Sequence, residues 1–344
     1  MIFRDKTFRY GNFMGLGFRL FIIINKDLLV SIGEKNIEIL KEQLYKTFKA
    51  HEEFIEDGMV VGIWLKSKEE MEGRGIFFRY NINPNLKKCY LDLNADYYFK
   101  NPEYRYPMIV HELTHWHDRA ITHRWHKSHL VSDREEVNLL SMILHSLRID
   151  GLANFRMFYS KANKNELFLK EPHKISMIAR DVEVNLDFVS YVLDFKTRLN
   201  NFKKELIKSA HPKEIIAGWV AAQYKHFYFL GGMMCYFILF RNMIKKGQTE
   251  QIQIFLDKNQ KNKINIKKIK NYLYRKELYF GKVPLEIFEY TFKEIKKLKP
   301  AEFFIIYLEA SKVLGLGHDK TLLFDESEIE IIIKHRYEID REIE

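Results

Sequence analysis

Short apolar runs and one longer amphipathic segment alternate along the first hundred residues. The long segment, 34–56, repeats its apolar residues at intervals of three and four, which predicts a helix. The turn formers Asn83, Pro84 and Asn85 separate two of the apolar runs. The predicted strands are 17–31, 59–65, 74–82 and 88–93.

Helical periodicity dominates from about residue 100 to the end of the sequence. We therefore predict an α+β fold, in which a small N-terminal part with a sheet precedes a predominantly helical part. Three regions are expected: an α+β subdomain over 1–100, a helical subdomain over 101–246 and a C-terminal helical region over 247–344. The predicted helices are 104–123, 133–160, 175–209, 213–246, 249–258, 264–277, 284–297, 300–313 and 326–341.

Composition favours a packed protein without a nucleic-acid partner. The 344 residues are 47% hydrophobic and 15% aromatic, which is enough for a sizeable core. The formal net charge is +10, and lysines are densest from Lys245 to Lys299 along helical patterns. We interpret them as a solvated helical face, with a functional basic surface as the alternative. The sequence contains no recognised nucleic-acid-binding signature.

Cysteine usage and apolar stretches bear on location. Cys89 and Cys235 are far apart in apolar surroundings, so we expect no disulfide framework and a reducing, cytoplasmic location. The apolar stretch 13–25 contains Arg19 and has no cleavage signal, so we do not interpret it as a signal peptide. The uncharged stretch 227–240 is shorter than the roughly 20 residues of a membrane-spanning helix, so a buried helix is predicted.

The segment His111-Glu112-Leu113-Thr114-His115 matches the pattern H-E-x-x-H on the predicted helix 104–123. Residues four apart share one face of a helix, so His111 and His115 can direct both imidazoles at one zinc ion. Glu112 is placed to act as general base toward a water activated by that zinc. The pattern therefore predicts one zinc ion per chain, on a helix at the junction between the sheet and the helical part.

Other residues near this motif allow further interpretations. Asp118 can hydrogen-bond to a ligand imidazole, and a surface position is the alternative. His117 follows His115 by two residues and should point elsewhere. With His123, His126 and His129 it suggests a second metal site, but a solvated polar loop is the preferred reading.

A catalytic zinc site usually has a third protein ligand, and two segments can supply it. One begins at Asp150, which Gly151 follows directly. The other contains Glu135 and Glu136, on a second helix predicted to follow the motif helix. From the residues alone, Asp150, Glu135 and Glu136 all remain candidates.

The motif and the stretch Asp150-Gly151-Leu152-Ala153-Asn154-Phe155 together resemble the gluzincin type of zincin metallopeptidases. In that group a downstream Glu-Gly-small-Ala-aromatic stretch commonly supplies the third ligand; here Asp replaces Glu. The resemblance therefore makes Asp150 the preferred third ligand, with Glu135 or Glu136 as alternatives. The resemblance implies a metallopeptidase-like helical part and an edge strand beside the substrate, for which Tyr90-Leu91-Asp92-Leu93 is the candidate. Small residues at 151 and 153 would let the ligand helix approach the motif helix closely.

Zincins often stabilise the oxyanion of the reaction with a Tyr or His from a later helix. The resemblance therefore makes Tyr228, and after it His226, candidate catalytic residues. Gly231 and Gly232 follow them and would permit close packing near the site. The alternative is that both aromatic side chains belong to the core.

The function predicted from these observations is a zinc metallopeptidase that hydrolyses a peptide or protein substrate, with no nucleic-acid partner and no membrane span. Two other classes remain open. One is a non-peptidase zinc hydrolase or an inactive zinc-binding interaction protein. The other is a basic helical binding protein without metal. Retention of Glu112 favours catalysis, because a purely structural zinc site has no need of a general base.

Overall fold

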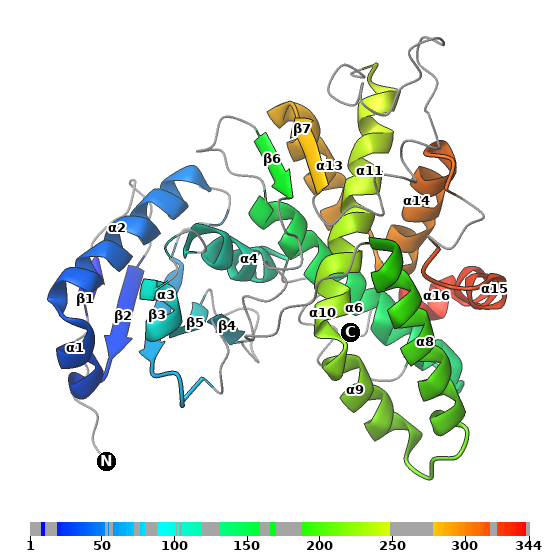
Figure 1. Ribbon diagram of the computed structural model, residues 1–344, viewed down its shortest axis with the longest axis horizontal. Coiled ribbons are helices and arrows are strands. Elements are labelled where there is room, and N and C mark those ends of the chain that lie inside the picture. The colour runs from blue at the N-terminus through cyan, green and yellow to red at the C-terminus, as the bar shows by residue number, and fades with distance from the viewer. Residues whose placement is uncertain are drawn as a thin grey trace. The chain divides into compact units, whose positions relative to one another are not determined.

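The computed structural model describes residues 8–10, 19–51, 54, 58–71, 76–79, 88–100, 102, 105–118, 131–158, 166–169, 188–247, 278–316 and 322–341. The chain divides into two compact units. Unit 1 comprises Met1–His123 with Met177–Glu183, and unit 2 comprises Arg124–Ser176 with Val184–Glu344. The elements of both units are labelled in Figure 1.

Unit 1 contains a five-stranded mixed sheet with the strand order β1-β2-β3-β5-β4. The three inner strands, β2, β3 and β5, are parallel, whereas β1 and β4 pair antiparallel at the two edges. Cys89, Leu91 and Leu93 alternate along β5 and are buried, as the predicted pattern required. The strands are β1 Phe8–Tyr10, β2 Arg19–Ile24, β3 Val60–Lys66, β4 Ile76–Arg79 and β5 Lys88–Asn94.

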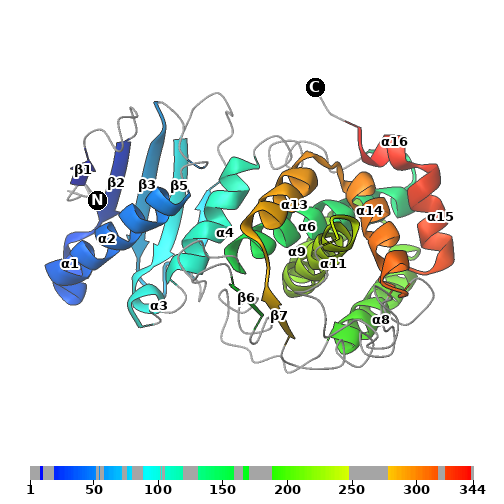
Figure 2. The ribbon, with the colours of Figure 1, turned by 90° about the horizontal axis from the view of Figure 1, so that it is seen from above.

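Four helices accompany this sheet in unit 1, and Figure 2 shows α2 running beside the inner strands. The longest, α2, buries Ile37, Leu40, Leu44 and Phe48, which recur at the three- and four-residue spacing of one helix face. This confirms the helix predicted over 34–56 as far as Ala50, where α2 ends. The helices are α1 Lys26–Ile32, α2 Glu34–Ala50, α3 Ala95–Lys100 and α4 Arg105–His117.

Two strand predictions in unit 1 are wrong. The strand expected over 17–31 ends at Ile24, because the side chain of Asn25 accepts a hydrogen bond from the Leu28 amide at 2.7 Å and caps α1. The strand containing Tyr90–Leu93 is not an edge strand. It belongs to β5, which lies between β3 and β4, so β4 forms that edge of the sheet.

Unit 2 is built around the 24-residue helix α6, Glu135–Phe158. Helices α11, α13 and α14 and the π-helix η4 pack against it. The remaining helices are α8 Phe188–Leu206, α9 Pro212–Ala222, α10 Tyr224–His226, η4 Phe227–Gly231, α11 Gly232–Lys245, α13 Leu285–Lys297, α14 Pro300–Val313, α15 Glu326–Lys334 and α16 Arg336–Ile339.

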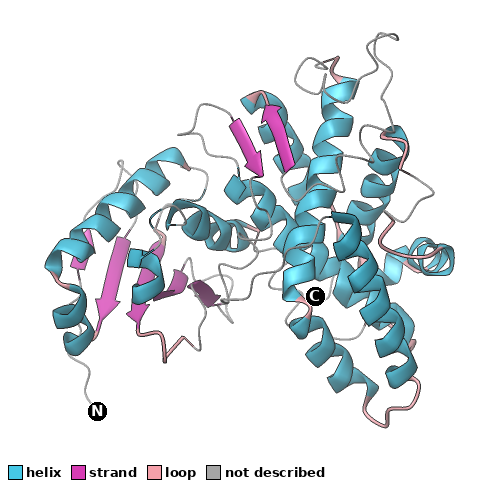
Figure 3. Cartoon of the chain, in the orientation of Figure 1, coloured by secondary structure: helices cyan, strands magenta, loops and turns pink. Residues whose placement is uncertain are grey.

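The expectation of an entirely helical chain after residue 100 is wrong. Strands β6 Glu166–Leu169 and β7 Leu278–Lys282 pair antiparallel in unit 2, and both are visible in Figure 3. They are more than a hundred residues apart, so no local sequence pattern could predict their pairing. The predicted helices 249–258 and 264–277, and the first part of 175–209, lie outside the described residues.

The two units also divide the chain differently from the three expected regions. Helix α4 packs against α2 and β4 and so belongs with the N-terminal sheet, although the boundary was expected at residue 100. Helices α13 and α14 pack against α6 and α11. For this reason the described residues after 246 join the helical unit and do not form a region of their own.

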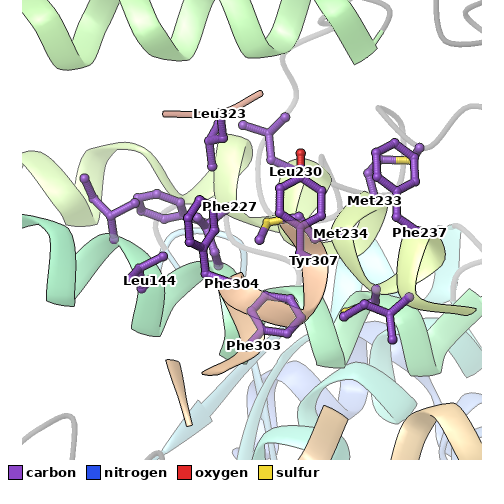
Figure 4. Close-up of a cluster of buried hydrophobic side chains, with 14 of the residues drawn as sticks. Leu144, Phe227, Leu230, Met233, Met234, Phe237, Phe303, Phe304, Tyr307 and Leu323 are labelled. Atoms are coloured by element: carbon purple, nitrogen blue, oxygen red, sulfur yellow. The ribbon is translucent and has the colours of Figure 1, made fainter. Parts of the chain in front are cut away.

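Aromatic side chains of α11 and α14 fill much of the core of unit 2, as Figure 4 shows. Phe237 stacks on Tyr307 with ring centroids 5.8 Å apart, and Phe155 of α6 stacks on Phe288 at 4.5 Å. Cys89 and Cys235 are both buried thiols and are not disulfide-bonded. The continuous helical run Tyr224–Lys245 is long and apolar enough to cross a membrane by length and composition, yet 89% of its apolar window is buried inside the protein.

Three buried arginines of α6 and α11 secure helix α13. Arg148 donates hydrogen bonds to the carbonyls of Ile295, Lys296 and Leu298, at the end of the helix where the last carbonyls lack the usual partner four residues later. Arg156 and Arg241 form ion pairs with acidic residues of α13, at 2.8 and 2.6 Å. Each buried guanidinium therefore has partners within the core, as a buried charge requires.

Helix α6 and the π-helix η4 cross in direct backbone contact. A Cβ atom added to Gly231 would lie 2.1 Å from the Leu147 carbonyl oxygen, and one added to Gly151 would lie 2.4 Å from the Gly231 carbonyl carbon. The Asn154 side chain donates a hydrogen bond to the Tyr228 carbonyl across the same crossing. Gly231 thus permits the close packing expected of it. Gly151 was expected to let α6 approach the motif helix closely, but the element that it contacts is η4 of its own unit.

We predict that Gly231→Ala destabilises the protein by about 1–3 kcal/mol, because the added methyl group must displace backbone. Gly218→Ala is the matched control: it also lies in a helix, nothing lies within 4 Å of its added Cβ, and alanine should leave stability unchanged or raise it by up to about 1 kcal/mol. Urea unfolding midpoints compare the two. Equal midpoints for the two variants would contradict the close crossing.

The buried His145 of α6 should make the stability of the folded protein sensitive to acid. Burial, with the nearby Arg148 charge, lowers the pKa of His145 to about 4, and its Nδ1 has no hydrogen-bond partner among the described residues. The unfolded chain binds this proton near pH 6.5, so stability is complete above that pH and is lost as the pH falls toward 4. The shift corresponds to about 3 kcal/mol at most. His145→Leu should flatten the decline in unfolding midpoint between pH 6.5 and 4, whereas the exposed His211→Leu should not.

Candidate metal centre

Helix α4 is buried along most of its length. Nine consecutive residues, 108–116, are buried, including His111, Glu112 and His115 at 5%, 7% and 5% exposure. Pro107 lies in the first turn, where its missing amide hydrogen costs no helical hydrogen bond. The motif is therefore helical as predicted, and its polar side chains are held within the protein.

The two motif histidines face each other one turn apart. Their Nε2 atoms are 3.1 Å apart, and the ring centroids are separated by 4.7 Å at an interplanar angle of 85°. Two nitrogens bound tetrahedrally to one zinc at about 2.05 Å would lie roughly 3.3 Å apart. The histidine pair thus has the separation that a shared ion requires. In the metal-free chain the same separation suits an Nε2–H···Nε2 hydrogen bond.

Asp150 completes a group of possible ligands with these histidines. One ligand atom from each of His111, His115 and Asp150 lies within 4.8 Å of the others, so the group can hold a metal ion. The two imidazoles are buried and Asp150 is half-buried. Two nitrogens and one carboxylate oxygen form a donor set common in catalytic zinc sites.

The alternative ligands Glu135 and Glu136 lie elsewhere on α6. Both are exposed in its first turn, and Glu136 forms an ion pair with Lys203 at 3.4 Å. They precede Asp150 by 14 and 15 residues, which is about 21–22 Å along a helix. Neither can therefore join a group that contains Asp150.

Neighbouring contacts fix the ends of α4 in unit 1. At its start, Arg105 donates hydrogen bonds to the carbonyls of Tyr98 and Phe99 at the end of α3. At its other end, His117 packs edge-on against Phe54, with ring centroids 5.5 Å apart, and so points away from the motif histidines as expected.

Asp118 is buried and its amide donates to the Thr114 carbonyl, so the interpretation as a surface residue is wrong. His123, His126 and His129 lie outside the described residues.

His226, the second candidate for oxyanion stabilisation, is already engaged in unit 2. Its Nε2 is 2.8 Å from Asp194, which also accepts a hydrogen bond from Arg198 at 2.8 Å. Burial lowers the pKa of His226, and hydrogen bonding to Asp194 opposes this effect. Burial alone would raise the pKa of Asp194, but its hydrogen bonds with Arg198 and His226 lower it overall. His226 therefore joins α8 to the start of η4.

Tyr228, the first candidate, lies within η4 near the crossing with α6. Its side chain is half-buried and packs edge-on against Tyr224, with ring centroids 5.8 Å apart. Its carbonyl accepts a hydrogen bond from Asn154, which follows Asp150 by one helical turn. The backbones that carry Asp150 and Tyr228 are thus joined in one rigid crossing. The spacing from Asp150 to Asn154 is visible in the sequence, but Asn154 was given no role there.

The chain matches no protein-family model, no curated protein and no solved structure. The resemblance to gluzincins therefore stays a prediction that rests on the motif and on the stretch from Asp150 to Phe155. What the structure adds is that the three candidate ligands lie close enough together to hold a metal ion.

We expect Asp150→Asn to weaken zinc binding strongly, because the substitution removes the only charged ligand of the group. Glu136→Gln is the matched control, since it removes a carboxylate from the same helix about 21 Å away and should leave affinity unchanged. The zinc affinity of the two variants is measured from their zinc content after dialysis and by competition with a chromophoric chelator. Equal affinity in the two variants would exclude Asp150 as a ligand.

Proposed function

We propose that this protein is a zinc-dependent metallopeptidase. The observation that carries the proposal is the group formed by His111, His115 and Asp150, together with the burial of Glu112 on the helix that carries both histidines. Three protein ligands are the number used by catalytic zinc sites, which keep a fourth position open. When bound, zinc would supply a Lewis acid that polarises a carbonyl group and acidifies water.

Glu112 has the role of general base in this proposal. Its carboxylate accepts a proton from water as the water oxygen forms a bond to the carbonyl carbon of the substrate. It then delivers that proton to the amine nitrogen as the carbon–nitrogen bond breaks, which leaves a carboxylic acid and an amine. Its buried position in α4, one residue after His111, limits competing water.

Tyr228 is the proposed donor to the oxyanion that forms on the carbonyl oxygen. A phenol can donate one hydrogen bond, and each such donor typically lowers the barrier by a few kcal/mol. Its half-buried side chain and its attachment to the α6–η4 crossing favour it over His226, whose Nε2 already bonds to Asp194. We therefore assign His226 a supporting position at the residue that precedes η4.

Glu112→Gln should retain zinc and lose about 10²–10⁴-fold or more in peptide cleavage, because an amide cannot act as a general base. The measurement is cleavage of a fluorogenic peptide library by zinc-loaded protein, with zinc content determined on the same samples. Glu135→Gln, which removes an exposed carboxylate, should cleave like the unsubstituted protein.

The results separate the possible functions. Undiminished cleavage by Glu112→Gln would overturn the proposed mechanism. Zinc binding without cleavage by the unsubstituted protein would favour the non-peptidase or inactive alternatives, and absence of bound zinc would overturn the proposal altogether.

A further inference from the structure

A buried histidine outside the motif, His51, contacts helix α4 on the side away from the metal-binding imidazoles. His51 follows the last residue of α2 and is fully buried. Its Nε2 and the Tyr106 hydroxyl share a short hydrogen bond, and the two rings are tilted with centroids 5.6 Å apart. This contact joins the end of α2 to the first turn of α4.

Phe54 extends the same contact to the other end of α4. Its ring stacks on His51, with centroids 5.2 Å apart and an interplanar angle of 28°. Its edge contact with His117 reaches the last residue of the helix. The Phe54 amide donates to the His51 carbonyl at 3.0 Å, so a local turn holds the two rings together.

The geometry of an α-helix places these contacts opposite the ligands. At about 100° per residue, Tyr106 and His117 are 11 residues apart and so lie within roughly 20° of one another. His111 and His115 lie about 140° and 180° around the helix from Tyr106. His51 and Phe54 therefore hold the back of α4 at both ends, while the imidazoles project from its front.

We propose that His51 is a positioning residue for the metal centre: through Tyr106 and Phe54 it fixes the rotation of α4, and thereby the direction in which the His111 and His115 imidazoles project. Its relevance to catalysis rests on the proposed function, but the positioning itself is a property of unit 1. A small rotation of α4 moves both imidazoles together, so loss of this contact displaces the pair from the place where the metal ion would be held. Supporting contacts of this kind typically change metal affinity by 10–100-fold.

The test compares variants of His51 and Tyr106 in the full chain. Tyr106→Phe and His51→Leu each remove the shared hydrogen bond and should weaken zinc binding about tenfold or more. The double variant should be no weaker than either single variant, because both lose the same bond. His51→Gln should restore much of the affinity, since its amide reaches the position of Nε2. Tyr45→Phe, at an exposed tyrosine of α2, is the control.

Two further readouts separate positioning from general destabilisation and from failure of the proposed function. The absorption bands of the cobalt-substituted protein should shift in Tyr106→Phe and stay unchanged in Tyr45→Phe. In metal-free protein, the ring nitrogen NMR signals of His111 and His115 should also shift in Tyr106→Phe.

If the unsubstituted protein bound no zinc, the proposed function would fail, and the NMR signals would still decide the role of His51. Unchanged ring signals in Tyr106→Phe would overturn the positioning role. So would failure of His51→Gln to bind better than His51→Leu in a protein that takes up zinc.

Discussion

The backbone contact between Gly151 and Gly231 is the constraint on which the arrangement of unit 2 depends. A side chain on either residue would meet main-chain atoms at 2.1–2.4 Å, so α6 and η4 can approach this closely only as a pair of glycines. The residue before Gly151 is Asp150, and the segment that ends at Gly231 contains Tyr228. One close crossing therefore fixes the backbone of a candidate ligand and of a candidate catalytic residue.

The same crossing helps to explain why this segment of the chain is a π-helix. A π-helical turn widens a helix and is costly, so it persists where surrounding contacts determine it. Here Asn154 bonds to the Tyr228 carbonyl from one side, and the pairing of His226 with Asp194 holds the preceding turn from the other. These contacts anchor η4 to α6 and to α8, within a helical unit that has a large apolar and aromatic core.

The sequence was most informative where the determinants are local. The periodicity of α2, the alternation along β5 and the spacing of His111 and His115 all follow from patterns within one element, and the structure has them as predicted. The preference for Asp150 over Glu135 came from a family resemblance, and the reason that excludes Glu135 became visible only with the length of α6.

Determinants that depend on distant residues could not be predicted in this way. The pairing of β6 with β7 and the position of β4 at the edge of the sheet are set by tertiary contacts between separated segments. His51 gave no signal either, because it lies 55 residues before Tyr106 and belongs to no motif. The Asn25 cap of α1 was the exception, since an Asn before Lys26 and Asp27 is a local signal that was overlooked.

Charge bears on the same group of candidate ligands. Asp150 is half-buried and lies with a pair of imidazoles that must be neutral to act as ligands, and Glu112 is buried on the helix that carries that pair. A carboxylate is less costly to remove from water where a positive charge lies nearby. Under the proposed function, a divalent cation held by His111, His115 and Asp150 would supply such a charge, and the Asp150 carboxylate would balance part of it. The burial of the motif helix and the donor types of the group are therefore compatible with one another only if the charges of ion and carboxylates are considered together.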